Sequence, residues 1–207
     1  YHYPFENQDL FLRKFPADCV VEMYEQARLW FYTLLVVNTA LFGKVPYKNV
    51  IAHGVMLAKD GKKLSKSKRN FPPMDEVLDT YGGDILRYFI LTSPIVEAEG
   101  ARFYAEALDE VKRDFFLLLW NSTKYFNTYA NRFNFLPTLN VPKSQNELDI
   151  WILTRLKDCI NQITEYLDNL QVLDASRILG PFVTDLSTWY IRRSRERISS
   201  GDQEALA

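Results

Sequence analysis

The sequence has few of the residues from which metal sites and disulfide frameworks are built. Its 207 residues include two histidines and two cysteines, Cys19 and Cys159, which lie far apart in ordinary apolar sequence. Neither residue type shows the spacing of a zinc motif or of a disulfide-rich domain. We therefore expect no protein-only metal site and no disulfide, as suits the reducing cytoplasm.

An excess of one charge is also missing. The 25 Lys and Arg residues are balanced by 26 Asp and Glu residues, which leaves a formal net charge of -1. This balance excludes a globally basic protein that wraps nucleic acid. Any binding of polyanions must depend on local clusters of charge.

Long apolar runs are absent as well. The longest apolar stretch, around residues 29–42, is interrupted by Thr33, Asn38 and Thr39, whereas a membrane span needs about 18 or more apolar residues. Hydrophobic residues still make up 47% of the chain, enough for the core of one large or two small domains. We expect a soluble protein with no membrane partner.

The first residues do not resemble the start of a complete protein. Residues 1–6 (YHYPFE) lack an initiator methionine, a basic segment and an apolar signal core. This pattern suggests a chain cut out of something longer, so we expect a fragment.

Strand and helix patterns alternate in the first part of the chain. We expect a buried strand over residues 18–23, a helix over 25–42 that ends at Gly43, and a second strand over 49–58 that is interrupted at Gly54. This order favours a parallel sheet with a right-handed crossover.

The rest of the chain is helical in pattern. Apolar residues recur at helical spacing in residues 74–81, 85–92, 105–132, 147–170 and 174–198. The last three segments predict a bundle, since no strand lies between them. The expected fold class is therefore α/β followed by all-α, with a boundary near residues 93–105 and domains at 1–98 and 99–207.

A basic loop follows the second expected strand, at residues 60–70. It begins with an Asp-Gly turn and carries Lys62, Lys63, Ser65, Lys66, Ser67, Lys68 and Arg69. Open α/β sheets bind ligands at the carboxyl ends of their strands, and lysine ammonium groups suit a triphosphate and the charge on a departing pyrophosphate. A solvated surface loop or a nonspecific RNA contact has the same composition, so these alternatives stay open.

The motifs around this loop resemble those of the class I aminoacyl-tRNA synthetases. Residues 63–67 (KLSKS) are similar to the KMSKS signature of that family, with Leu64 in place of the usual methionine. Further matches are His53-Gly54, Asp60-Gly61, Asn70 and residues 81–87 (YGGDILR). The resemblance implies the C-terminal half of a Rossmann-type nucleotide-binding domain, followed by an incomplete helical domain of the anticodon-binding type.

Segments across nearly the whole chain resemble the isoleucyl group of this family. They are residues 2–7, 15–18, 30–35, 39–43, 46–50 and 189–195. A valyl enzyme is the alternative, although it shares only the later motifs, and a noncatalytic RNA-binding or structural module is another. The resemblance implies a parent ligase, expected to be a monomer, that activates isoleucine with ATP and transfers it to tRNA(Ile).

The resemblance also implies roles for particular residues. Lys63 and Lys66 would act on the departing pyrophosphate, and Ser65 and Ser67 would bind the nucleotide. The residues implied to bind ATP and the adenylate are Glu22, Glu25, Gln26, His53, Gly54 and Val55. Magnesium would arrive with ATP as part of the substrate complex. Taken alone, His53 also fits a simple buried position in a strand.

The segment implied to contact the adenylate departs from the family pattern EGxDQTRGW. Residues 22–30 read EMYEQARLW, so Met23 stands where glycine allows close backbone approach, and Glu25 is one methylene longer than the family's aspartate. Strand alternation would place Met23 and Glu25 on the same face. We expect a locally rearranged site.

A second cationic stretch lies near the C-terminus. Helical spacing places Arg192 and Arg195 on one face and Arg193 and Arg197 on another. The candidate tRNA-binding residues are Arg192, Arg193 and Arg195, because guanidinium groups donate hydrogen bonds to phosphates. Pairing with nearby carboxylates, those of Asp185 and Glu196, is an alternative that the sequence leaves open.

One element of the family is missing. The HIGH motif of class I active sites has no counterpart at His2 or His53. The resemblance therefore implies that the first half of the nucleotide-binding fold lies before Tyr1. We expect the 207-residue chain alone to be catalytically inactive.

Overall fold

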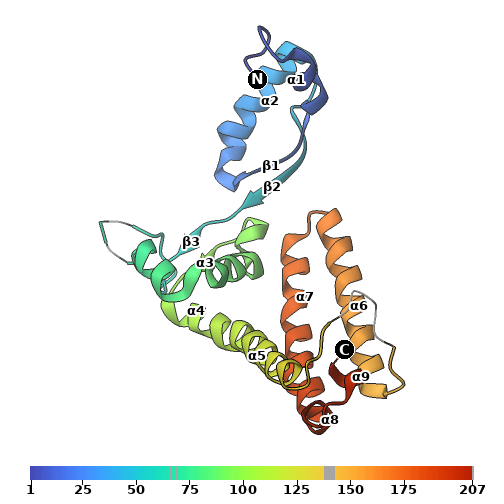
Figure 1. The fold of residues 1–207 in the computed structure, drawn as a ribbon. Helices are drawn as coiled ribbons and strands as arrows, with labels where there is room; N and C mark the ends of the chain where they lie inside the picture. Colours follow the sequence, from blue (N-terminus) through green and yellow to red (C-terminus); the bar gives the residue numbers. More distant parts are fainter. Residues whose placement is uncertain (66, 69, 138–142, 207) are drawn as a thin grey trace. The chain divides into compact units, whose positions relative to one another are not determined.

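The structure, a computed structural model, describes residues 1–65, 67–68, 70–137 and 143–206 (Figure 1). The chain forms two compact units, one of residues 1–71 and 93–103 and the other of residues 72–92 and 104–207. The units thus do not divide the chain at a single point near residue 98, because the chain enters the helical unit, returns to the first unit and then leaves it again.

The first unit combines two small parallel sheets with helices. Its elements are α1 (Gln8–Lys14), β1 (Ala17–Met23), the 3-10 helix η1 (Tyr24–Arg28), α2 (Trp30–Phe42), β2 (Tyr47–His53), β3 (Met56–Leu57), the 3-10 helix η2 (Pro94–Glu97) and β4 (Ala101–Arg102). β1 and β2 pair in parallel, and α2 connects them (Figure 1). The predicted strand, helix, strand order and the parallel pairing are confirmed.

The predicted strand over residues 49–58 is in fact two strands in different sheets. β2 pairs with β1, whereas β3 pairs in parallel with β4. Between them, the Gly54 backbone N–H donates to the Ile95 carbonyl at 2.6 Å. The predicted interruption at Gly54 is confirmed, whereas the prediction that both parts form one strand was wrong, since they pair with different strands.

The second unit is helical. Its elements are α3 (Met74–Thr92), α4 (Ala105–Val111), the π-helix η3 (Lys112–Phe116), α5 (Leu117–Arg132), α6 (Glu147–Asp168), α7 (Val172–Thr184), the π-helix η4 (Asp185–Ile191), α8 (Arg195–Ser200) and α9 (Gln203–Leu206). The three long helical segments are present as predicted, two of them with a π-helical stretch. The two short helices are merged into α3, which is kinked at Gly82, where φ is 78°.

Core packing explains why α3 belongs to the helical unit. α3 contacts α4 and α7, and the Tyr88 ring of α3 stacks on Phe115 of η3 with 4.1 Å between centroids. Leu108, on α4, is fully buried. Burial also raises the pKa of the Tyr88 hydroxyl. Apolar contact between helices thus outweighs the position of α3 along the chain.

Candidate functional site

The carboxyl ends of β1 and β2 form the first part of the candidate site. The parallel register pairs Met23 with His53, and it pairs Glu22 with Ala52. Gly54 directly follows this edge. The structure therefore brings together Glu22, His53 and Gly54 at the edge where open α/β sheets bind their ligands.

Glu25 and Gln26 lie in η1 and not in β1, which ends at Met23. The prediction that strand alternation places Met23 and Glu25 on one face was therefore wrong. The Gln26 side-chain Oε1 accepts a hydrogen bond from the Trp30 backbone N–H at 3.1 Å, which ties η1 to the first turn of α2. The Glu25 side chain is exposed to solvent.

Gly54 has a structural reason to be glycine. A Cβ atom at this position would overlap the backbone carbonyl of Glu99. The close approach is therefore made by backbone, and a binding role for Gly54 stays a prediction. Next to it, the Val55 carbonyl accepts from Ala101 N–H at 3.1 Å, and His53 Nδ1 lies 2.9 Å from the Gly54 carbonyl oxygen.

The signature loop leaves the end of β3 through a tight turn. Ala58 N–H donates to the Lys62 carbonyl at 2.8 Å, and Lys63 forms an antiparallel bridge with Leu57. The Lys62 ammonium pairs with Asp60 at 3.3 Å, and the hydrogen bond from the Lys62 backbone N–H lowers the pKa of the Asp60 carboxyl. Both lysine side chains are exposed, and the Lys62 ammonium is held by the neighbouring Asp60 carboxylate.

The two serines of the loop contact each other. Their hydroxyl oxygens lie 2.9 Å apart, and the Lys68 backbone N–H donates to the Ser65 carbonyl at 3.2 Å, which closes a turn. Ser65 and Ser67 therefore share one side of this turn. Lys66, the other predicted catalytic lysine, lies outside the described residues.

Arg102 is a neighbour of the loop that sequence analysis missed. β4 pairs Arg102 with Leu57, and the Arg102 Nη2 atom lies 3.6 Å from the position that a Cβ atom of Gly61 would take. The guanidinium therefore adds positive charge beside the Asp60-Gly61 turn. No local pattern indicates this, because β4 has two residues and lies far from the loop in sequence.

Arg197 differs from the other arginines of its segment in exposure and in ion pairing. Arg192, Arg193 and Arg195 are exposed, and within the described part of the chain no carboxylate forms an ion pair with them. Asp185 instead pairs with Arg155 at 3.0 Å. The expected alternative of pairing with Asp185 therefore does not apply to these three arginines.

Arg193 has an aromatic partner that sequence analysis did not single out for binding. Its guanidinium carbon lies 3.9 Å from the centroid of the Trp189 ring. Trp189 is 47% exposed, so an arginine and an indole are stacked at the surface. The four-residue spacing on a helix is the sequence signal that could have indicated this pair.

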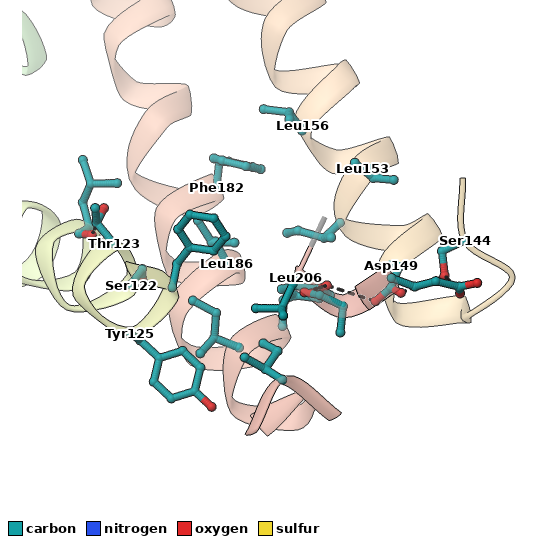
Figure 2. A pocket seen from close by; sticks show the side chains of 18 residues that line it. Ser122, Thr123, Tyr125, Ser144, Asp149, Leu153, Leu156, Phe182, Leu186 and Leu206 are labelled. Carbon is teal, nitrogen blue, oxygen red and sulfur yellow. Dashed lines mark hydrogen bonds between the residues drawn. The ribbon is translucent and has the colours of Figure 1, made fainter. Parts of the chain in front are cut away.

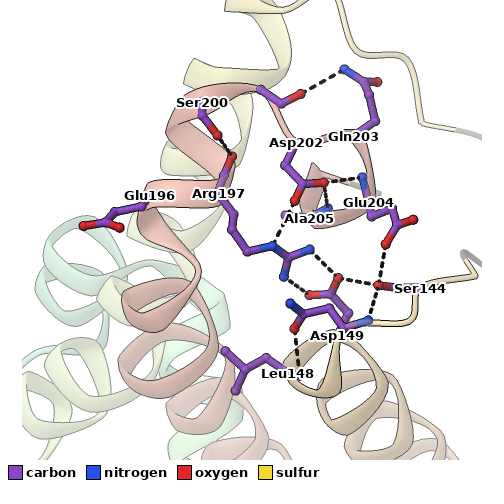
Figure 3. A network of polar contacts seen from close by, with 12 residues as sticks. Ser144, Leu148, Asp149, Glu196, Arg197, Ser200, Asp202, Gln203, Glu204 and Ala205 are labelled. Carbon is purple, nitrogen blue, oxygen red and sulfur yellow. Dashed lines mark hydrogen bonds and ion pairs between the residues drawn. The ribbon is translucent and has the colours of Figure 1, made fainter.

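Arg197 belongs to a polar network around the buried carboxylate of Asp149 (Figure 3). It donates to both carboxylate oxygens of Asp149, which also accepts from Ser144 and Tyr190. Burial raises the pKa of the Asp149 carboxyl, but the hydrogen bonds from Arg197, Ser144 and Tyr190 outweigh this effect and hold the pKa below its usual range. Arg197 is therefore engaged in holding the fold.

A cavity of about 430 Å³ lies in the helical unit. Figure 2 shows its largely apolar lining, which includes Leu153, Phe182 and Leu206, with Ser144 and Asp149 at one end. None of the predicted site residues lines this cavity. Its buried carboxylate is already held by the polar network, so we assign the cavity to helix packing.

Two further properties concern metals and membranes. Within residues 1–65, 67–68, 70–137 and 143–206, no group of three His, Cys, Asp or Glu side chains is arranged to hold a metal ion. Over the same residues, no helix combines the length and the apolar character that crossing a bilayer requires.

Two family models match the chain. Residues 1–102 match the class I tRNA synthetases for I, L, M and V, and residues 149–207 match the anticodon-binding domain of tRNA ligases. An isoleucine–tRNA ligase of Protochlamydia amoebophila is 42% identical over 95% of this chain, and one of Rickettsia prowazekii is 42% identical over 98%. The chain spans 19% of the length of each of these relatives.

Solved structures with a similar fold come from the same group of enzymes. A Mycobacterium tuberculosis methionyl-tRNA synthetase bound by methionyl-adenylate matches with a TM-score of 0.76 and 20% identity, over 99% of this chain and 40% of the other. An Agrobacterium radiobacter K84 LeuRS–tRNA–LeuAMS complex matches with a TM-score of 0.68 and 17% identity, over 92% and 25%. At these identities the likeness shows the fold.

Proposed function

The chain belongs to the class I tRNA synthetases, and we propose that it is part of an isoleucine–tRNA ligase that forms isoleucyl-adenylate from ATP and transfers isoleucine to tRNA(Ile). The named relatives support the isoleucyl assignment over a valyl one. A noncatalytic module is not favoured by any of them. A cytoplasmic location suits this role in translation.

One observation carries the proposal. The first unit presents the paired ends of β1 and β2, where Met23 and His53 are partners, and also a lysine-bearing loop that leaves the end of β3. Open α/β sheets bind nucleotides at this edge, and the flexible positive charges of lysine suit a triphosphate. Both features occur in a single compact unit.

The proposed chemistry assigns a task to each feature. The isoleucine carboxylate attacks the α-phosphate of ATP, and pyrophosphate leaves. Lys63 and Lys66 stabilise the charge that develops on the leaving group, and the hydroxyls of Ser65 and Ser67 donate to phosphate oxygens. The adenylate is held by Glu22, Glu25, Gln26, His53, Gly54 and Val55. Mg²⁺ enters with ATP as part of the substrate.

The exposed apolar surface of the first unit supports a place within a larger domain. Val21 on β1 and Val50 on β2 are 57% and 44% exposed, and Leu41 on α2 is 70% exposed. A two-stranded sheet is marginally stable alone, and a helix that is apolar on several sides is usually buried in a larger core. We infer that this unit serves as half of a nucleotide-binding domain.

The helical unit supplies the proposed contact with tRNA. Arg192, Arg193 and Arg195 extend from a short stretch of chain into solvent, and exposed guanidinium groups bind phosphates. Trp189, stacked beneath Arg193, adds an aromatic face of the kind on which unpaired bases stack. These properties support a role in RNA binding.

Amino-acid-dependent ATP–pyrophosphate exchange tests the proposal. The protein encoded by the complete reading frame is expected to catalyse exchange with isoleucine and much less with valine. The 207-residue chain serves as the control, and we expect its exchange to match a blank without enzyme. Exchange by the short chain, or equal exchange with valine, would contradict the proposal.

A further inference from the structure

We infer that Asn70 is a positioning residue that holds the backbone of the signature loop around Lys63. This inference rests on the proposed function of Lys63. The Asn70 side chain accepts a hydrogen bond from the Ser65 backbone N–H, with 2.8 Å from nitrogen to Oδ1. Its Nδ2 donates to the Lys63 carbonyl oxygen at 3.2 Å. One partly buried amide thus binds the backbone on both sides of Leu64.

The two hydrogen bonds of Asn70 extend the support that β3 gives to the start of the signature loop. Lys63 is already bridged to Leu57 of β3, and β3 is held by the bond from Phe103 N–H to the Leu57 carbonyl at 2.7 Å. Beyond Lys63 the chain leaves this support. Asn70 then secures the Ser65 backbone from the returning end of the loop.

The chemistry of the position calls for asparagine. A carbonyl oxygen must be met by a donor and a backbone N–H by an acceptor, and the carboxamide provides both at once. Aspartate keeps the acceptor but loses the donor, and leucine of similar size loses both. The variants Asn70→Asp and Asn70→Leu therefore separate the two bonds.

The inferred benefit concerns the exposed ammonium group of Lys63. A lysine side chain is flexible, so the direction in which its backbone projects it has to be set by other groups. Electrostatic stabilisation is strongest when the charges are oriented before the reaction. Asn70 supplies part of that orientation without touching the substrate.

Amide hydrogen exchange in the complete ligase tests the contacts directly. In Asn70→Leu, the Ser65 amide should exchange about 2- to 12-fold faster, the range expected for one lost hydrogen bond. In Asn70→Asp the same amide should stay protected, because the acceptor remains. Asn49→Leu is a matched control, since Asn49 bonds the Asp18 carbonyl in the same unit, and it should leave Ser65 unchanged.

Two results of the hydrogen-exchange experiment would overturn the inference. One is unchanged Ser65 exchange in Asn70→Leu. The other is faster exchange throughout β1 and β2 in that variant, since this would give Asn70 a general role in folding.

A double-mutant cycle in the complete ligase tests the link to Lys63. Asn70→Leu should lower kcat for isoleucine-dependent exchange and leave the KM for isoleucine unchanged. In a Lys63→Ala background the same change should have little further effect, because the two residues act as a unit. If the two substitutions instead lower kcat by independent factors, so that the double variant shows their product, positioning through Lys63 is refuted. Absence of exchange in the unmodified ligase would instead refute the proposed function, while the Ser65 result would still stand.

Discussion

Arg197 and Asp149 form a bidentate ion pair, with 2.9 Å between Nη1 and Oδ1 and 2.8 Å between Nη2 and Oδ2. The pair joins α8 to the first turn of α6. Arg197 Nε also contacts Asp202 at 2.9 Å, and Asp202 accepts from the Glu204 backbone N–H in α9. One guanidinium thereby holds three helices together.

Removing this guanidinium should destabilise the helical unit. Arg197→Ala leaves the Asp149 carboxylate, which is 3% exposed, without its charged partner. We expect a loss of about 3–5 kcal/mol in the free energy of unfolding, measured by urea denaturation followed by circular dichroism. Arg195→Ala is the control, because Arg195 is exposed, and it should change stability by about 0.5 kcal/mol or less. Equal effects of the two variants would contradict the assignment.

Acid should weaken the same network. The folded state lowers the pKa of Asp149, so the stability gained is fully present above the unfolded-state pKa of about 3.9. It is lost as the pH falls below that value and through the folded-state pKa. Asp149→Asn should be less stable at neutral pH and should lose less stability on acidification. Urea titrations between about pH 5 and pH 2 measure the difference; parallel curves would speak against it.

The exposed arginines should contribute to RNA affinity. Arg192→Gln, Arg193→Gln and Arg195→Gln should each weaken binding of a tRNA(Ile) transcript to the chain, and each lost phosphate contact should reduce the slope of log K against log salt by roughly 0.7–0.9. Filter binding at several salt concentrations gives both values. Lys157→Gln, an exposed change of equal charge on α6, is the control. If it has the same effect, binding depends on net charge only.

The signature lysines should act on the rate of adenylate formation. In the complete ligase, Lys63→Ala and Lys66→Ala should each lower kcat by roughly 10² to 10³ and change the KM for isoleucine little, as expected when a stabiliser of the transition state is lost. Lys62→Ala should have a smaller effect, because the Lys62 ammonium pairs with Asp60. Wild-type exchange rates in Lys63→Ala and Lys66→Ala would mean that the loop is a solvated surface loop without a role in catalysis.

The altered adenylate segment gives a further prediction. Met23→Gly should cost about 1–3 kcal/mol, because Met23 is partly buried at the end of β1. Glu25→Asp should leave melting unchanged, since its side chain is exposed, and should alter the KM for ATP in the complete ligase. Thermal melts and exchange kinetics separate the two effects. Unchanged melting and kinetics in the double variant would mean that the segment is wrongly aligned with the family pattern.

Much of this protein follows from local sequence. Alternating apolar residues, glycine stops and helical spacing were enough to predict the order of β1, α2 and β2 and the three long helical segments. The predicted pairing of β1 with β2 was right because a strand, helix, strand unit has few other solutions. The motif order around residues 63–67 indicated the family, since it depends on residue types at fixed spacing.

The tertiary structure decided which of several equivalent residues serve the fold and which face solvent. Helical spacing places Arg193 and Arg197 on the same face, yet only the structure shows that Asp149 of another helix binds Arg197. Position 54, directly after β2, requires glycine because the Glu99 backbone occupies the space of a side chain. In each case the deciding partner lies more than forty positions away in the chain. Local patterns carry no information on such contacts, because hydrogen bonding and close packing depend on which distant segments come together when the core forms.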